Sequence, residues 1–420
     1  MVLHFGKELY GHGGTKPAIA CLLSALVRAA TLRTAPRGAT HDKPSADDWD
    51  FSARAMARYW SINGRFLTQP LSGVQRYAQE IVRGLDALVS EGHPLAQDLE
   101  LEVVTPPGAV RPLELNAIGI RSAGRRGGHA WEQLSLPKAP RGGLLSLANA
   151  GPVAARKHIV CIHDVNTRLT PTSYSPQFRA LYRILVPALG RSAARVTTVS
   201  HFSADQLVGF RIAGRGKMAV IPNGHEHALT WQARHSLTTE RAGGASTILL
   251  LGSPAPHKNM QMLLGLADQL AAMGLRLAII GKVDSRVFAK TAPQTDAPNV
   301  IWLGGVSDDE LAAMMADCLC LAFPSLTEGF GLPVLEAMAR GCPVVSTNRA
   351  SLPEVCGEAA LLASPTEPAA WLAHFQRLKQ DPALRAVLIE RGHAQANRFR
   401  WKKSAEIYLR LMARLDGLEA

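Results

Sequence analysis

Short apolar runs alternate with amphipathic stretches along most of the chain. The runs Leu101–Thr105, His158–His163 and Val196–Val199 have the length and composition of buried strands. Residues 74–88 instead carry apolar side chains at positions 74, 77, 78, 81, 82, 85 and 88, which is the spacing of one helix face. Strands that alternate with helices predict an α/β fold built on parallel sheets.

The same alternation returns after residue 245. The predicted strands there are Thr247–Leu251, Leu277–Gly281, Val300–Leu303 and Cys318–Phe323. The predicted helices run from Asn259 to Met273, from Val306 to Ala316, from 367 to 379, from 383 to 397 and from Phe399 to Met412. The Asn259 side chain is expected to cap the first of these helices. Acids at 308–310 lie in a first helical turn, where acids commonly oppose the helix dipole, so they do not indicate a metal site.

A chain of 420 residues is too long for one ordinary hydrophobic core, so two domains are expected. The expected division is an N-terminal extension over 1–58, an N-terminal domain over 59–228, a polar linker over 229–245, a C-terminal domain over 246–397 and a terminal helix over 398–420. The extension is expected to be disordered, or to follow from a start codon placed too early. A signal or transit peptide is a weaker alternative, because its apolar stretch starts late.

One glycine turn carries the clearest chemical signal. Gly329 and Gly331 follow a buried strand and let the backbone approach a ligand closely, and Pro333 then suits the first turn of a helix. Free backbone N–H groups and the positive end of a helix form a site for a phosphate. Glu328 and Glu336 flank this turn, and two carboxylates suit the hydroxyls of a sugar and a ribose better than they suit phosphate oxygens. An isolated Glu pair would more often be a helix cap and a surface residue.

This stretch resembles the Glu-x7-Glu signature of retaining glycosyltransferases of the family-4 type. The loop from Asn63 to Gly73 and the turn from Pro256 to Asn259 resemble those of bacterial polysaccharide mannosyltransferases. The resemblance extends to Phe323–Ser325, Pro343–Val345 and Leu352–Val355 and covers about residues 60 to 415. It implies the GT-B fold, in which two Rossmann-like domains face each other across a cleft and the second holds most of the nucleotide. It also implies that the terminal helix packs back on the first domain.

The resemblance assigns roles to residues on both sides of that cleft. It implies that His163 approaches the transferred sugar, that Gly73 faces the donor diphosphate and that Glu336 holds the ribose hydroxyls. Glu328 and the turn hold the sugar and diphosphate, and the donor-binding residues there are Gly329, Phe330, Gly331 and Leu332. Lys258 lies at a strand-to-helix junction, where it can meet a diphosphate as a point charge. Many family members carry arginine where this chain has Ser253, so the phosphate site is expected to rely on Lys258, His257 and backbone amides.

Charge and cysteine usage bear on partners and compartment. The net charge is +12, and seven basic residues stand against one acid between Arg156 and Arg195, which indicates contact with an anionic membrane surface. Aromatic residues make up only 6%, and the absence of a nucleic-acid motif argues against nucleic-acid binding. Six scattered cysteines without metal-ligand spacing favour a reducing cytoplasm. Together with the basic residues, this predicts a cytoplasmic protein attached to the inner face of the cell membrane. Asp48 and Asp50 have metal-binding spacing but follow no strand.

The expected function is transfer of a hexose, with mannose from GDP-mannose as the preferred donor, to a hydroxyl of a glycan or lipid-linked glycan with retention of configuration. No essential metal or cofactor is expected. One alternative is a nucleotide-sugar epimerase or hydrolase on the same fold, and another is a non-catalytic sugar-nucleotide-binding protein. A dehydrogenase is disfavoured because no Gly-x-Gly-x-x-Gly follows the first strand.

Overall fold

The computed structural model describes residues 57–108, 110–252, 255–281 and 297–418. Ser253, Cys21, Asp48, Asp50 and nearly all of the predicted N-terminal extension lie outside these ranges. Contacts between residues divide the described chain into two compact units. The first unit comprises Ile162–Ile184 and Thr197–Ala405, and the second comprises residues 57–161, Leu185–Val196 and residues 406–418.

The first sheet has seven strands in the order β3-β2-β1-β4-β5-β6-β7. These strands are β1 (Arg58–Asn63), β2 (Leu99–Thr105), β3 (Gly119–Ser122), β4 (Gly143–Ser146), β5 (His158–Cys161), β6 (Arg195–Thr198) and β7 (Met218–Val220). The ladders that join β3, β2, β1, β4 and β5 are all parallel. The order 3-2-1-4-5-6 is that of a doubly wound Rossmann sheet, and it reverses between β1 and β4.

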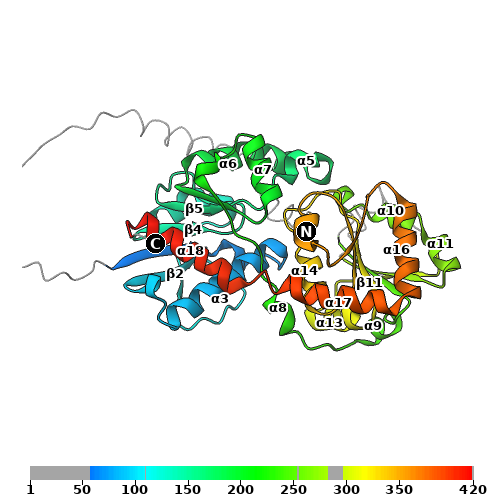
Figure 1. Cartoon of the computed structure of the whole chain (residues 1–420). Helices are drawn as coiled ribbons and strands as arrows, with labels where there is room; N and C mark the ends of the chain where they lie inside the picture. Colours follow the sequence, from blue (N-terminus) through cyan, green and yellow to red (C-terminus); the bar gives the residue numbers. More distant parts are fainter. Residues whose placement is uncertain (1–56, 109, 253–254, 282–296, 419–420) are drawn as a thin grey trace, which may run out of the picture. The chain divides into compact units, whose positions relative to one another are not determined.

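The second sheet has six strands in the order β10-β9-β8-β11-β12-β13 and lies within the first unit. These strands are β8 (Thr247–Leu251), β9 (Arg276–Ile280), β10 (Val300–Gly304), β11 (Cys320–Phe323), β12 (Val344–Thr347) and β13 (Leu361–Ala363). All of its ladders are parallel, and its order repeats the Rossmann pattern with the reversal between β8 and β11. The predicted parallel α/β architecture is confirmed (Figure 1).

Helices connect these strands. They are α3 (Gly73–Ser90), α4 (Gly128–Leu134), α5 (Asn166–Leu169), α6 (Pro176–Ser192), α7 (His201–Gly209), α8 (Glu226–Leu229), α9 (Leu237–Ala242), α10 (Met260–Leu264), α11 (Ala267–Ala272), α13 (Asp308–Asp317), α14 (Leu332–Ala339), α15 (Leu352–Cys356), α16 (Pro368–Gln380), α17 (Pro382–Ala396) and α18 (Trp401–Leu415). Short 3₁₀ turns are η1 (Gly64–Thr68), η2 (Pro94–Ala96), η3 (Leu136–Lys138), η4 (Pro171–Ser173), η5 (Arg215–Lys217) and η6 (Pro256–Lys258).

The core of the first unit is built on one face of the second sheet. Ile248 and Leu250 alternate along β8, so both point to the same side, where they join side chains from β9 and β11 in one apolar cluster. Helix α16 covers that cluster with Trp371 and Phe375, both fully buried. The Trp371 indole N–H donates to the Ser364 carbonyl at 2.8 Å, so its one polar group is satisfied in the core.

In the second unit, the C-terminal half of α18 contacts β1 and α3. The hydroxyls of Tyr77 and Tyr408 lie 3.0 Å apart, and both rings are fully buried. Asp416, which follows α18, accepts hydrogen bonds from Arg58 at 2.7 Å and from the Trp60 indole at 3.1 Å. These contacts tie the chain's last helix to its first described strand.

The predicted helix from Asn259 to Met273 is wrong in two respects. The segment forms two shorter helices, α10 and α11, which are separated around Gly265. Asn259 makes no side-chain capping bond; it adopts a left-handed conformation and donates to the carbonyls of Pro324 and Pro365 at 3.2 and 3.0 Å. The side chain therefore binds neighbouring loops instead of the start of its own helix.

Two other local interpretations have clear outcomes. The acids at 308–310 lie in the first turn of α13, as predicted, and Ser307 and Glu310 make a reciprocal capping box there. The predicted polar linker contains α9, which begins with a capping box between Ser236 and Thr239. Small polar residues are common both in loops and at helix starts, so the composition of this segment did not predict its short helix.

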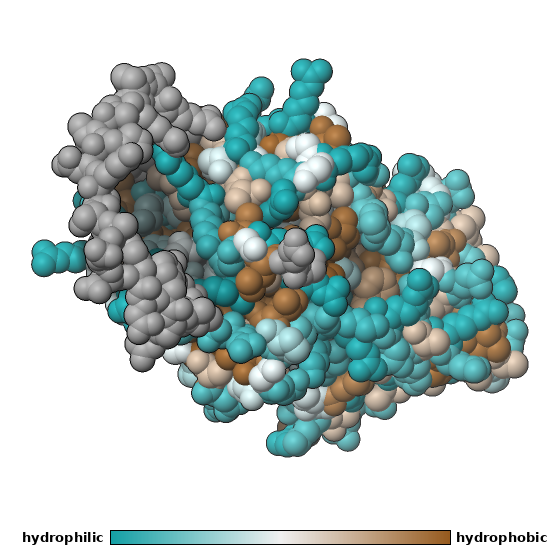
Figure 2. All heavy atoms as spheres, turned by 60° about the vertical axis from the view of Figure 1, so that its left-hand side comes forward, coloured by the Kyte–Doolittle hydropathy of each residue, from teal (hydrophilic) through white to brown (hydrophobic). Residues whose placement is uncertain are grey.

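Hydrophilic side chains separate small apolar patches on the face that Figure 2 shows. No helix among the described residues is long and apolar enough to cross a membrane.

Candidate functional site

Two predicted site residues meet at the point where the strand order of the second sheet reverses. Lys258 follows β8 in η6, and Glu328 follows β11, the neighbouring strand across the reversal. The Lys258 Nζ lies 2.6 Å from the Glu328 Oε1. Their side chains are only 13% and 12% exposed, so water screens this ion pair less than it would at an open surface. Ligands of doubly wound sheets bind in such a crevice beyond the carboxyl ends of the strands.

Both glycines of the turn are required by close approach. A Cβ on Gly329 would lie 2.9 Å from the His163 carbonyl oxygen, and the Gly329 carbonyl accepts hydrogen bonds from Ser200 and Ser203 at 2.7 and 3.1 Å. Gly331 has φ of +104°, and a Cβ there would lie 2.5 Å from the Leu352 side chain. The turn is therefore fixed in place from both sides, directly before α14 begins at Leu332.

The hydroxyl of Ser351 also fixes this turn, because it lies 3.0 Å from the Glu328 carbonyl oxygen and 2.9 Å from that of Phe330. The Phe330 ring is buried and meets Phe399 edge to face at 5.6 Å. Leu332 is buried as well. The Phe330 and Leu332 side chains are thus packed into the protein, and what the segment can offer a ligand is mainly backbone.

His163 lies just beyond β5, is 5% exposed, and belongs to the same unit as the glycine turn. Its neighbour Asp164 accepts the Asn166 backbone N–H at 2.9 Å. Burial raises the pKa of Asp164; the Asn166 bond and the nearby His163 oppose this rise, and the charge of Glu328 adds to it. The backbone of His163 lies against the glycine turn, and the role of its imidazole at the transferred sugar stays a prediction.

His257 has a structural partner. Its Nδ1 lies 2.9 Å from the Ser173 hydroxyl, and its ring stacks on Tyr174 with centroids 6.2 Å apart. Burial, and then the positive charge of Lys258, lower the pKa of His257 to about 4. The imidazole is therefore neutral at pH 7, and the role of His257 at a donor diphosphate stays a prediction.

Glu336 meets a residue that the sequence did not single out. The Glu336 Oε1 lies 2.8 Å from the His227 Nε2, and the Trp401 indole N–H lies 2.9 Å from the His227 Nδ1. An indole can only donate, so Nδ1 accepts and Nε2 carries the proton that His227 donates to Glu336. All three groups are buried, and this relay orients the Glu336 carboxylate. Nothing in the local sequence around His227 or Trp401 signals this contact.

Gly73 lies in the second unit as the first residue of α3. It is exposed, and no atom lies within 4 Å of the position where a Cβ would be. Its backbone is not among the positive-φ glycines. The fold therefore does not require glycine at this position, and the role of Gly73 at a donor diphosphate stays a prediction.

A second buried polar cluster lies where the strand order of the first sheet reverses. Glu132 accepts a hydrogen bond from Asn63 at 2.9 Å, forms an ion pair with Arg65 at 3.0 Å and lies 2.9 Å from the His129 Nδ1. Burial opposes the charge of Glu132, but Arg65, His129 and Asn63 outweigh it and lower its pKa to about 2. Sequence analysis did not identify this cluster, because its members come from separate elements.

Among the described residues, no three His, Cys, Asp or Glu side chains gather as metal ligands would.

Comparison with known proteins identifies the family of this chain. Residues 238–395 match the family described as glycosyl transferases group 1. The O-antigen chain mannosyltransferase B of Escherichia coli is 31% identical over 277 residues, which cover 60% of this chain and 68% of that protein. The chain belongs to the glycosyl transferases group 1 family. It is a glycosyltransferase, which confirms the predicted family and enzyme class.

Two further relatives are mannosyltransferases by their names. The MMP alpha-(1->4)-mannosyltransferase of Mycolicibacterium hassiacum is 27% identical over 289 residues, which cover 65% of this chain and 69% of that protein. The chain spans about a third of the Escherichia coli serotype-specific mannosyltransferase WbdA, at 27% identity over 61% of this chain.

Solved structures agree on the fold of this glycosyltransferase. The sucrose-phosphate synthase of Thermosynechococcus elongatus superposes with a TM-score of 0.62 at 16% identity and covers 85% of this chain and 98% of its own. WaaG, a glycosyltransferase involved in lipopolysaccharide biosynthesis, gives a TM-score of 0.59 at 16% identity, covering 84% of this chain and 98% of its own. At these identities the likeness establishes the GT-B fold alone.

Proposed function

We propose that this glycosyltransferase moves a mannosyl group from GDP-mannose to a hydroxyl of a glycan or lipid-linked glycan, with retention of configuration, in polysaccharide biosynthesis. The names of its relatives support the sugar, since the Escherichia coli and Mycolicibacterium hassiacum proteins are mannosyltransferases. One observation carries the proposal: the Lys258–Glu328 ion pair beside the glycine turn at the strand reversal of the second sheet.

Each residue of this site has a proposed task. Lys258 and the start of α14 stabilise the departing diphosphate, whose negative charge grows as the bond from the sugar C1 breaks. Glu328 accepts hydrogen bonds from the sugar hydroxyls, and His163 contacts the same sugar. Glu336, oriented by His227, accepts from the ribose hydroxyls.

The proposed reaction needs no protein nucleophile. The bond between C1 and the phosphate oxygen breaks, the acceptor oxygen bonds to C1 on the same face, and the acceptor proton passes to the departing phosphate oxygen. Protein groups then serve to position the donor and to stabilise charge, which are effects of large catalytic value.

A panel of nucleotide sugars tests the proposal. Thermal unfolding is followed with GDP-, UDP-, ADP- and dTDP-linked sugars, with Glu336→Ala as the control protein. We expect GDP-mannose alone to raise the midpoint, and we expect the shift to vanish in the variant. Product analysis then decides the reaction: donor turnover without any acceptor would replace the transferase proposal with an epimerase or hydrolase, and donor binding without turnover would replace it with a binding protein.

We also propose that the enzyme is cytoplasmic and attaches to the inner face of the cell membrane through the basic segment Arg156–Arg195. Helix α6 carries Arg179, Arg183 and Arg191, and the last two are exposed. Binding to vesicles should rise with anionic lipid content and fall with salt. If co-sedimentation with vesicles depends on neither the anionic lipid content nor the salt concentration, this proposal is wrong.

A further inference from the structure

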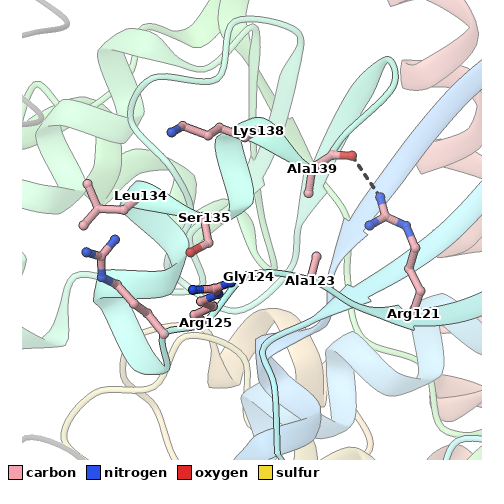
Figure 3. A pocket seen from close by; sticks show the side chains of 9 residues that line it. Arg121, Ala123, Gly124, Arg125, Leu134, Ser135, Lys138 and Ala139 are labelled. Atoms are coloured by element: carbon pink, nitrogen blue, oxygen red, sulfur yellow. Dashed lines mark hydrogen bonds between the residues drawn. The ribbon is translucent and has the colours of Figure 1, made fainter.

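A basic hollow opens on the second unit, apart from the residues described above. Its volume is about 660 Å³. It is lined on one side by the loop that follows β3 and on the other by the end of α4 and the η3 turn (Figure 3). Ala123, Ser135 and Ala139 contribute small side chains and Gly124 contributes none, so the hollow has room for a ligand.

Four cations line this hollow: Arg121, Arg125, Arg126 and Lys138. Arg121 is already paired, because it donates to both Glu102 carboxylate oxygens, at 2.5 and 2.8 Å, and to the Ala139 carbonyl at 2.9 Å. Hydrogen bonds from Arg121 lower the pKa of Glu102, so this carboxylate stays charged and engaged. Within the described ranges, no hydrogen bond or ion pair holds the side chains of the other three cations.

The loop that carries Arg125 and Arg126 is anchored at the two residues before them. The Trp131 indole N–H donates to the Ala123 carbonyl at 2.7 Å, and Trp131 is fully buried. Gly124 has φ of +84°, and a Cβ there would lie 2.6 Å from the Ser135 Cβ. The loop therefore packs directly on the turn opposite. A bound anion would supply these cations with a partner of opposite charge.

The lining favours phosphate over other anions. Two arginine guanidinium groups match the paired oxygens of phosphate groups, and Lys138 and the Ser135 hydroxyl can add single donors. No aromatic ring lines the hollow among the described residues, so a nucleobase would find no stacking partner here. The chemistry thus suits a phosphate or diphosphate without a base, which differs from the donor.

We propose that this hollow binds the phosphate or diphosphate group of the acceptor. Only the identification of the ligand as the acceptor rests on the proposed function; the binding of a phosphate group does not. Binding of the acceptor at its phosphate would leave the hydroxyl end of its glycan free to react.

Calorimetry with inorganic pyrophosphate tests the site directly. Because Lys258 could also bind pyrophosphate, the titrations use the Lys258→Ala protein. We expect binding to persist there and to weaken roughly tenfold or more when Arg125→Glu and Arg126→Glu are added. The matched control adds Arg377→Glu and Arg391→Glu, two exposed arginines of the other unit with the same change in charge, and should keep its affinity.

Thermal unfolding without ligand verifies that each of these proteins is folded. An absence of pyrophosphate binding in the Lys258→Ala protein, or an equal loss in the control, would overturn the site. Binding to phosphatidylglycerol vesicles without any binding of pyrophosphate would also overturn it, in favour of a membrane surface. These readouts need no transfer reaction, so they stand even if the proposed function fails.

A kinetic comparison tests the acceptor assignment. The two acceptors are a glycan linked through a diphosphate to a short polyprenyl chain and the same glycan with a free reducing end. Arg125→Glu with Arg126→Glu should raise KM roughly tenfold for the first acceptor and leave KM for the second and for the donor unchanged. If KM for the first acceptor does not change, the hollow binds a free anion instead. An equal rise in KM for both acceptors would also overturn the assignment, because the second acceptor has no phosphate.

Discussion

Replacing His227 by Phe tests whether one imidazole holds two buried polar groups. The substitution keeps an aromatic ring of similar shape between Trp401 and Glu336 but removes both hydrogen bonds. The Trp401 indole N–H and the Glu336 carboxylate would then each lose the partner that the structure gives them. Trp231, whose ring meets His227 edge to face at 5.5 Å, would keep a ring neighbour.

The expected loss of stability follows from these two groups. A buried donor or acceptor without a partner costs about 1–3 kcal/mol, and a charged group costs more. With His227 4% exposed and Glu336 8% exposed at their side chains, little water can replace the imidazole. We therefore expect His227→Phe to lower the free energy of unfolding by about 3 kcal/mol. Trp401→Phe removes one neutral hydrogen bond and should cost about 1 kcal/mol.

Urea unfolding followed by circular dichroism measures these losses, and calorimetry with GDP measures the site. Donor affinity should fall in both variants, and more in His227→Phe, because Glu336 then loses its direct partner. Glu336→Gln combined with His227→Phe should cost less than the sum of the single changes. If His227→Phe unfolds at the wild-type urea concentration and binds GDP normally, the relay does not orient Glu336.

Four further predictions address other parts of the chain. Gly73→Ala should leave the free energy of unfolding unchanged or raise it by about 0.5–1 kcal/mol, since alanine favours helices, and it should weaken donor binding. If a thermal-shift titration gives the variant and the wild type the same donor affinity, Gly73 has no role in donor binding. Glu132→Gln should lower the free energy of unfolding by about 3 kcal/mol above pH 4.5, and this difference should disappear as the pH falls to about 2, because folding depresses the pKa of Glu132. A difference between the two proteins that does not change with pH would contradict this. In Cys21→Ser, a maleimide should label thiols only when the protein unfolds, because the five described cysteines are buried and burial raises the pKa of Cys356 to about 12. Labelling of the native protein would show that one of these thiols is accessible. Lys258→Ala should reduce kcat/KM by about 100-fold with the fold intact, and near-normal turnover in a steady-state assay would argue against the site.

What could be predicted from sequence was local. The strand, glycine turn and helix around Gly331 follow from residues within one short segment, and helix α3 follows from an apolar period within its own length. The partners of Glu336 could not be predicted this way, because His227 lies 109 residues away and Trp401 lies 174 residues beyond His227. Periodicity carries no information on such contacts.

The error at Asn259 has the same origin. An asparagine before an apolar helix commonly caps it, and that local preference was the basis of the prediction. In the structure, two carbonyls from distant loops offer the amide better partners, at Pro324 and Pro365. Local preference decides a residue's role only where no tertiary partner competes for the same side chain.

The Lys258–Glu328 pair shows how a site can be stable before its ligand arrives. Neither side chain is exposed enough for water to compensate its charge fully, so each would be costly alone, and in the free chain each satisfies the other. A nucleotide-diphosphate sugar offers a replacement for both, since its phosphates can take the ammonium group and its hydroxyls can donate to the carboxylate. Donor binding would then exchange one set of paired charges for another without leaving a buried charge unpaired. Under the proposed function, this exchange would explain why a cation and an acid lie side by side at a site for an anion that carries hydroxyls.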